Sequence, residues 1–197
     1  MDARIARTHQ AVMKAATDLL LEDGPNGLTV DAVVARSGVA KSTVYRHWAT
    51  RDELVADVFN HCAPILDQVD PALPFDQAIR RLAMTFVEIM DDEHWRRLIP
   101  AMVMLKSQKD AIEHLNTEMH DQQSEVISSV LRRGVDEGVL RPSVLEDLDT
   151  TMTLLVGPIL MAALVETVPL DAALADMVVA QFLAGQQAVD SPALLTH

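Results

Sequence analysis

The segment from Lys41 to His47 combines hydrogen-bond donors with positive charge, which is the chemistry needed to hold a polyanion. It contains lysine, arginine, histidine, tyrosine, serine and threonine, and it contains no carboxylate. Lysine and arginine bind phosphates or guanine edges, and hydroxyl groups donate hydrogen bonds to phosphate oxygens. Thr29 precedes the segment and Arg51 follows it, and each is a further candidate for binding a phosphate. Whether these groups act together depends on the elements that carry them.

Residues 28–48 predict two short helices joined by a tight turn. Thr29 is a good N-cap for the first helix, because its hydroxyl can accept a hydrogen bond from an early amide. Gly38 suits a turn position that requires a positive φ. The apolar residues predicted to point inward are Val30, Val33, Val34, Val39, Val44 and Trp48. The donors of the second helix then remain outside, in a helix-turn-helix arrangement.

An outward-facing helix of this kind fits the major groove of DNA, where the residues near its N-terminus meet the base edges. The alternatives are that Thr29 is only a cap, that Tyr45 packs inside the protein and that His47 is an ordinary surface histidine. The joint placement of the donors on one short helix favours DNA binding. The predicted DNA-binding residues are Thr29, Lys41, Ser42, Thr43, Tyr45, Arg46, His47 and Arg51.

The charge of the chain is uneven. The 197 residues carry a net charge of −13, which excludes a uniformly basic nucleic-acid-binding coat. Residues 1–60 contain seven Lys and Arg against eight Asp and Glu, whereas residues 61–197 contain nine against 21. Residues 3–17 and 36–51 contain basic residues and no acidic ones. These two stretches indicate one surface that is compatible with a polyanion, although charge alone is also explained by solvated faces.

The composition is that of a soluble protein with an aliphatic core. Apolar residues make up 49% of the chain and aromatic residues only 4%. Cys62 is the only cysteine, so an intrachain disulfide and a cysteine-rich zinc module are excluded. The N-terminus lacks the apolar stretch of a secretory signal. The longest apolar run, residues 154–165, is shorter than the about 20 residues that a membrane span needs. We predict a cytoplasmic protein without a membrane partner or a cofactor.

Helical periodicity extends along the chain, and strand-like alternation is almost absent. We predict an all-α fold of about nine helices, with a helix-turn-helix DNA-binding domain at residues 1–50 and a regulatory helical domain at residues 51–197. A stripe on the first helix is formed by Ile5, Val12, Ala16, Leu19 and Leu20. The predicted helices lie at about 3–22, 30–37, 41–48, 52–68, 75–90, 93–105, 110–137, 145–166 and 171–188.

Two sequence segments resemble the signature of a known family. Residues 38–48 are Gly-Val-Ala-Lys-Ser-Thr-Val-Tyr-Arg-His-Trp, and residues 51–54 are Arg-Asp-Glu-Leu. Together with Thr29 and the glycines before it, they resemble the DNA-binding head of the TetR family of bacterial transcription regulators. Two positions depart from that pattern, because Ala40 stands where a serine cap is frequent and Trp48 replaces a common phenylalanine. The rest of the chain is similar only in architecture.

The resemblance implies a homodimer that represses transcription and is released by a small ligand. A dimer also agrees with the physics of DNA binding, because one head reaches too few phosphates and two heads would bind a pseudo-palindromic operator. The last two helices carry more apolar residues than one bundle can bury, although these residues could instead be internal core. The predicted dimer residues are Leu160, Met161, Leu164, Met177, Val178 and Phe182.

A ligand pocket is predicted among apolar residues on helices that are expected to face one another. Methionine is flexible and fills irregular cavities, and prolines at positions 100 and 158 loosen helix packing. An ordinary core is the alternative role for each of these residues. The predicted ligand-binding residues are Phe86, Trp95, Leu98, Met102, Met119, Met152, Leu155 and Ile159. Their character suggests an apolar or aromatic effector.

The alternatives to this function are an enzyme, a metal-responsive regulator and a helical adaptor. An enzyme is disfavoured, because the chain has no nucleophile elbow, phosphate-binding loop, dinucleotide glycine pattern or His-Glu-x-x-His motif. A metal-responsive regulator would use His114, Glu118 and Asp121, which share one helix face, although polar residues at this spacing more often form a solvated face. A helical protein–protein adaptor would not need the acid-free stretch at residues 36–51.

Overall fold

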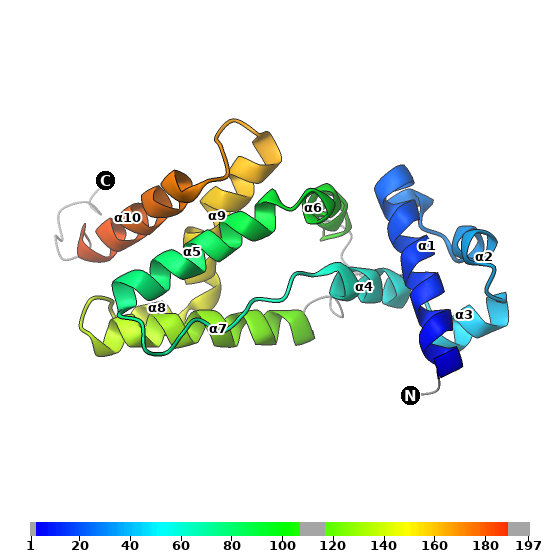
Figure 1. The fold of residues 1–197 in the computed structure, drawn as a ribbon, viewed down its shortest axis with the longest axis horizontal. Helices are drawn as coiled ribbons and strands as arrows, with labels where there is room; N and C mark the ends of the chain where they lie inside the picture. Colours follow the sequence, from blue (N-terminus) through cyan, green and yellow to red (C-terminus); the bar gives the residue numbers. More distant parts are fainter. Residues whose placement is uncertain (1–2, 107–116, 189–197) are drawn as a thin grey trace, which may run out of the picture. The chain divides into compact units, whose positions relative to one another are not determined.

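The computed structural model describes residues 3–106 and 117–188, without the side chains at positions 3–4, 102, 105–106, 117–122 and 187–188. Within these ranges the chain forms ten α-helices and no strand, which confirms the predicted all-α class. The helices divide into two compact units (Figure 1). One unit contains α1 (Ala3–Gly27), α2 (Val30–Ser37), α3 (Lys41–His47), α4 (Arg51–Cys62) and α6 (Glu93–Lys106). The other contains α5 (Phe75–Asp91), α7 (Thr117–Asp136), α8 (Ser143–Glu146), α9 (Leu148–Val165) and α10 (Ala172–Ala188).

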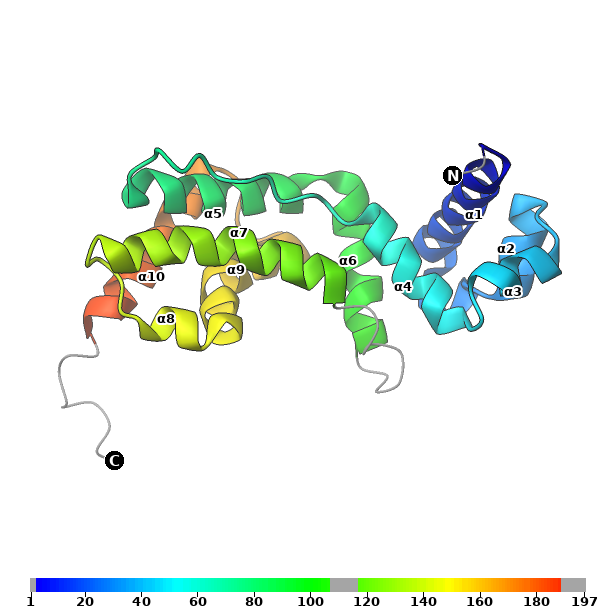
Figure 2. The same ribbon diagram turned by 90° about the horizontal axis from the view of Figure 1, so that it is seen from below.

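In the first unit, α1 is the central helix against which α2 and α4 pack (Figures 1 and 2). The predicted stripe of α1 is buried except for Ile5, which is 43% exposed. The buried apolar side chains of α1–α4 are Val12, Met13, Ala15, Ala16, Leu19, Leu20, Leu28, Val33, Val44, Trp48, Leu54, Val55, Ala56, Val58 and Phe59. This shared core holds the helix-turn-helix. The predicted division at residue 50 stays a prediction, and α4 belongs to the same compact unit as α1–α3.

Helix α4 ends at Cys62, which is earlier than the predicted end near residue 68. The reason is Pro64, which sequence reasoning overlooked as a helix terminator. A proline disfavours the helical conformation of the residue before it, and Ala63 accordingly has an extended backbone with φ −60° and ψ 130°. The chain from residue 63 to residue 70 forms no helix before a short turn leads into α5.

The second unit is built around α5, which lies against both α9 and α10 (Figure 1). Most of its apolar face is fully buried, from Phe75 to Val87. Gly134 of α7 passes close to this helix, since a Cβ atom added there would lie 2.6 Å from the Phe75 ring and 2.8 Å from Leu140. A glycine is therefore needed for the approach of α7 to α5.

The tenth helix comes from a break that the sequence analysis missed. The predicted helix at about 145–166 is divided into the short α8 and the long α9. Asp147 stands between them and caps α9, because its carboxylate accepts a hydrogen bond from the Thr150 backbone N–H at 3.1 Å. Hydrogen bonds from Thr150 also hold the pKa of Asp147 below its ordinary value.

Candidate nucleic-acid interface

Both ends of α2 have the local structure that their residues predicted. The Thr29 hydroxyl accepts a hydrogen bond from the Ala32 backbone N–H at 3.1 Å and so caps α2. Gly38 has a φ of +69°, and its N–H donates to the Val34 carbonyl at 3.0 Å. The cap and the positive φ are both confirmed. They set the direction in which the chain enters α3.

Helix α3 has one buried face and one exposed face. Val44 is fully buried and Trp48, directly after the helix, is 5% exposed. Tyr45 is 47% exposed, and Lys41, Ser42, Arg46 and His47 are exposed as well, while Thr43 is half-buried. Ala40 provides no side-chain cap, so the first turn of α3 has no side chain accepting from its amides. Of the donors predicted from the sequence, all except the half-buried Thr43 are therefore exposed on α3, away from the side of Val44.

A polar hollow of about 580 Å³ lies between the beginning of α1 and this side of α3. Thr43, Arg46 and His47 of α3 line it, and so does the turn from Gly38 to Ala40. On the α1 side it is lined by Ile5 and Thr8, which sequence reasoning did not select. The sequence signal that could have found them is the acid-free stretch at residues 3–17, which contains both. The hollow has room and hydrogen-bond donors for a phosphate group.

The cations near this surface differ in how they are bound within the protein. Lys41 Nζ lies 2.6 Å from Asp31 Oδ1, and this hydrogen-bonded ion pair raises the pKa of Lys41. The Lys41 ammonium also lies 5.9 Å from the centre of the Tyr45 ring. Arg46, by contrast, has no ion-pair partner within the described part of the chain. Arg46 is therefore the cation that is best placed to receive a phosphate or a base.

Arg51 is directed toward the protein backbone. Its Nε donates to the Leu28 carbonyl at 2.7 Å, its Nη2 donates to the Pro25 carbonyl, and its Nη1 lies 3.5 Å from Asp52 Oδ1. These contacts join the beginning of α4 to the last turn of α1 and to Leu28, which directly follows α1. A phosphate contact of Arg51 stays a prediction, and the structure adds a role in holding the helices together.

The predicted ligand-binding residues are mostly buried. Phe86, Leu155 and Ile159 lie in the core of the second unit, where Met152 is half-buried. Trp95 and Leu98 of α6 are buried in the first unit. The side chains of Met102 and Met119 lie outside the described residues. Burial agrees equally with a core role, so the pocket stays a prediction.

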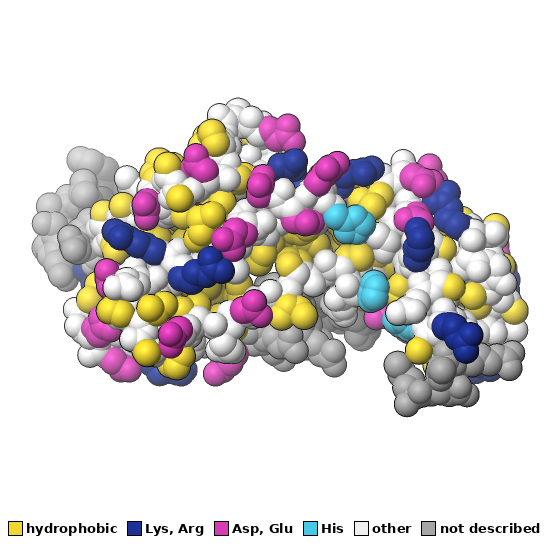
Figure 3. All heavy atoms as spheres, in the orientation of Figure 1, with side chains coloured by type: hydrophobic (Ala, Val, Ile, Leu, Met, Phe, Trp, Pro, Cys, Tyr) yellow, Lys and Arg dark blue, Asp and Glu magenta, His cyan; other side chains and the backbone are white. Residues whose placement is uncertain are grey.

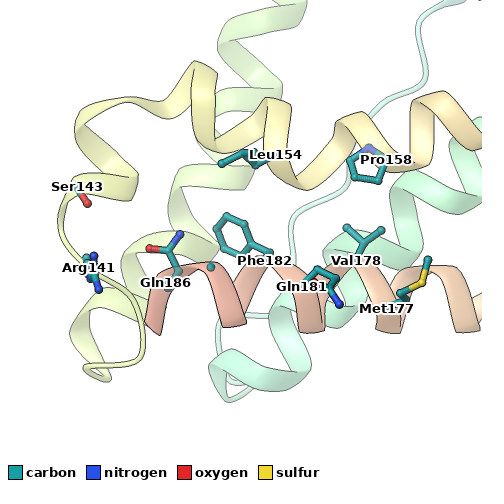
Figure 4. Close-up of a pocket in the computed structure, with 10 residues that line it drawn as sticks. Arg141, Ser143, Leu154, Pro158, Met177, Val178, Gln181, Phe182 and Gln186 are labelled. Carbon is teal, nitrogen blue, oxygen red and sulfur yellow. The ribbon is translucent and has the colours of Figure 1, made fainter. Parts of the chain in front are cut away.

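The predicted dimer residues divide into exposed and buried ones. Met161 is 61% exposed, Met177 50% and Leu164 39%, while Leu160 is half-buried. Val178 and Phe182 are buried within the chain and line the floor of a groove of about 520 Å³ between α9 and α10 (Figure 4).

Leu154 and Pro158 of α9 form the other side of this groove and were not selected from the sequence. Leu154 is 58% exposed and stands seven residues before Met161, a spacing that places both on the same side of a helix. Figure 3 shows apolar side chains at the surface where α9 and α10 lie.

By length and composition alone, Leu148–Val165 is also apolar enough to cross a membrane, with a mean hydropathy of 1.8.

The residues of the metal alternative, His114 and the side chains of Glu118 and Asp121, lie outside the described residues. Among the residues that the structure describes, no group of three or more His, Cys, Asp and Glu side chains is arranged to hold a metal ion.

Comparison with known proteins agrees with the helix-turn-helix geometry. Residues 12–58 match the bacterial regulatory proteins of the tetR family, and residues 75–182 match the tetracyclin repressor-like C-terminal domain. The chain belongs to the TetR family. It is therefore a DNA-binding transcriptional regulator, as the sequence resemblance implied, and the matched residues 12–58 include the whole of α3.

One relative matches most of this TetR regulator, and another matches about a quarter of it. The uncharacterized HTH-type transcriptional regulator YdeS of Bacillus subtilis is 28% identical over 156 residues, which cover 77% of this chain and 76% of YdeS. The HTH-type transcriptional repressor Rv3405c of Mycobacterium tuberculosis is 43% identical over 51 residues, which cover 26% of this chain and 27% of Rv3405c.

Solved structures of the TetR family share the fold. A putative TetR-family regulator from Mesorhizobium loti superimposes with a TM-score of 0.69 at 17% identity, covering 93% of this chain and 98% of that protein. The TetR family regulator SCO0332 superimposes with a TM-score of 0.63 at 24% identity, covering 90% of this chain and 97% of SCO0332.

Proposed function

We propose that this TetR regulator is a homodimeric repressor that binds a pseudo-palindromic operator and is released by a small apolar or aromatic effector. The observation that carries the DNA-binding part is the outward side of α3, where Tyr45 and Arg46 are exposed beside a polar hollow. The DNA-binding residues are proposed to be the set predicted from the sequence, with Thr8 added from the wall of the hollow. The name of the relative Rv3405c supports the repressor role.

Within this set, the local contacts suggest a division of roles. Thr29 uses its hydroxyl as a cap, so any phosphate contact at this position would come from the amides at the beginning of α2. Arg46 and His47 face the hollow and are proposed to hold backbone phosphate there. Lys41, Ser42, Thr43 and Tyr45 are proposed to meet base edges or phosphates along the groove.

The proposed dimer uses the exposed apolar sides of α9 and α10. Leu154, Met161 and Met177 are each at least half exposed in the single chain. Only 28% of Leu148–Val165 is buried within the chain, although this helix has one charged residue and is apolar from Leu154 onward. A second copy that covers this surface would remove it from water and would present two α3 helices to successive major grooves.

The proposed effector site uses the buried apolar residues of the regulatory domain, around Phe86, Leu155 and Ile159. A ligand releases DNA only if it binds one arrangement of the dimer more tightly than the other. The protein would thus act in the cytoplasm as a regulator, without catalysis and without a cofactor. A screen of small hydrophobic molecules and metal ions by thermal shift and DNA release tests this part. A response to metal ions alone would contradict the apolar effector.

The DNA-binding proposal is tested with duplexes from the region that flanks the protein's own coding sequence. The wild-type protein is expected to protect two half-sites in a footprint. Arg46→Ala and Tyr45→Ala are expected to weaken operator binding at unchanged helicity. Lys14→Ala is the matched control, because it removes one exposed positive charge of α1 that is paired with Asp18 outside the hollow. Equal affinity of the Arg46→Ala variant and the control would contradict the proposal.

A further inference from the structure

Three helices of the first unit meet at one carboxylate oxygen. Asp57 lies in the middle of α4, and its Oδ2 accepts a hydrogen bond from the Trp48 indole Nε1 at 2.8 Å. The same oxygen lies 3.0 Å from Nε2 of His9 in α1. Trp48 is the residue that directly follows α3. One oxygen of α4 is therefore bonded to α1 and to the end of α3.

The ring of Trp48 is held by neighbouring rings as well. The centres of the His9 and Trp48 rings are 5.4 Å apart at an angle of 37°, and those of His47 and Trp48 are 5.5 Å apart at 49°. Because the indole is also 95% buried, its position is defined by packing on its faces and by the hydrogen bond at its edge.

The connection from α3 to α4 is short and stiff. Only Ala49 and Thr50 separate Trp48 from the first residue of α4. The Thr50 hydroxyl accepts a hydrogen bond from the Glu53 N–H at 3.1 Å, and the Glu53 carboxylate accepts one from the Ala49 N–H at 2.8 Å. These reciprocal bonds resemble a capping box and hinder bending of the junction. The end of α3 is thus joined to α4 both along the chain and through Asp57.

We infer that Asp57 is a positioning residue for DNA recognition, which holds Trp48 and thereby sets the orientation of Tyr45 and Arg46 on α3. The inference rests on the proposed DNA-binding role of α3. The apolar core of the unit, from Val12 and Leu19 to Val44 and Phe59, is complete without this hydrogen bond. Loss of the bond therefore shifts α3 within a folded unit. Sequence-specific base contacts depend on that orientation more steeply than phosphate contacts do.

The test compares the affinity for operator with the affinity for an unrelated duplex of equal length, at one salt concentration. Trp48→Phe keeps the ring but removes the indole donor, and Asp57→Ala removes the acceptor. Each variant is expected to lower the ratio of operator affinity to unrelated-DNA affinity about tenfold, because operator affinity falls more than the affinity for unrelated DNA. Asp57→Asn keeps an amide oxygen that can accept from Trp48, so it is expected to retain most of the ratio. Asn60→Ala, an exposed position on α4, is the matched control.

The outcomes separate the inference from the proposed function. If the wild-type protein does not distinguish operator from unrelated DNA, the proposed function is wrong. If it does, and the Trp48→Phe ratio equals the wild-type ratio, Asp57 does not position α3. Equal weakening on both duplexes also overturns the inference, because it indicates a structural role only. Trp48→Phe carries the test if Asp57→Ala does not fold, and circular dichroism checks each variant.

Discussion

Asp31, in the first turn of α2, holds Lys41, the first residue of α3, at 2.6 Å. In the proposed DNA contact of Lys41, a phosphate would replace this carboxylate at the ammonium group. Both side chains are largely exposed, at 77% and 51%, so the ion pair is screened by water and can exchange with a phosphate. Asp31 is therefore expected to compete with DNA for Lys41.

Asp31→Asn is expected to strengthen DNA binding about two- to fivefold at low salt, because it frees Lys41 and removes a negative charge beside the interface. The gain should appear on operator and on unrelated DNA alike and should shrink as salt increases. Fluorescence anisotropy across a salt series measures it. Weaker binding of the variant would mean that the ion pair orients Lys41 for its contact.

Arg51→Ala is expected to destabilise the first unit by about 1–3 kcal/mol, because the backbone carbonyls of Pro25 in the last turn of α1 and of Leu28 after it lose a charged donor. Arg51→Lys should recover little of this, since an ammonium group cannot reproduce the guanidinium fork. Thermal unfolding measures the loss. An unchanged midpoint would contradict the structural role, and a salt slope lowered by about one unit would establish the additional phosphate contact.

Gly134→Ala is expected to lower the free energy of unfolding by about 1–2 kcal/mol, although alanine favours helix formation, because its methyl group would press on the buried Phe75 ring. Phe75→Leu should be destabilising by itself. The double variant should lose less free energy of unfolding than the two single variants lose together, since the clashing ring atoms are then absent. Additive losses in denaturant unfolding would contradict the close approach of α7 and α5.

Asp147→Asn keeps a capping oxygen at the beginning of α9 but removes its charge. Hydrogen bonds from Thr150 lower the pKa of Asp147 in the folded state, so the ionised carboxylate stabilises the fold at every pH above the unfolded-state pKa of 3.8. This stabilisation is lost as the pH falls through the folded-state pKa. The variant should therefore be less stable than the wild type at neutral pH and equally stable in acid. Thermal unfolding as a function of pH measures the difference. A difference that persists in acid would indicate another cause.

Met161→Glu is expected to convert the proposed dimer to a monomer, because it places a charge on the exposed apolar side of α9. Ile65→Glu is the matched control, since Ile65 is 82% exposed and lies outside α9 and α10. Sedimentation velocity distinguishes the two states. A dimeric Met161→Glu protein would place the interface elsewhere.

From the residues alone, the helical class, the caps and the outward set on α3 were predictable, because these depend on local chemistry. Thr29 caps α2 whatever surrounds it, and Gly38 is needed wherever a turn requires positive φ. The alternation of buried Val44 with exposed Tyr45 and Arg46 follows from helical periodicity. The missed end of α4 and the missed break at Asp147 were also local in origin, since Pro64 and the capping Asp147 are both visible in the sequence.

The pairing of side chains that are distant in the sequence was decided only by the tertiary structure. The sequence spacing of His9, Trp48 and Asp57 does not predict that the first two side chains meet at one carboxylate oxygen of Asp57. The angles between α1, α3 and α4 bring the three side chains together. Arg51 looked like a phosphate ligand because charge is a local property, but its partners depend on where the α1–α2 loop lies. Composition thus determines which groups are available, and packing determines which of them meet.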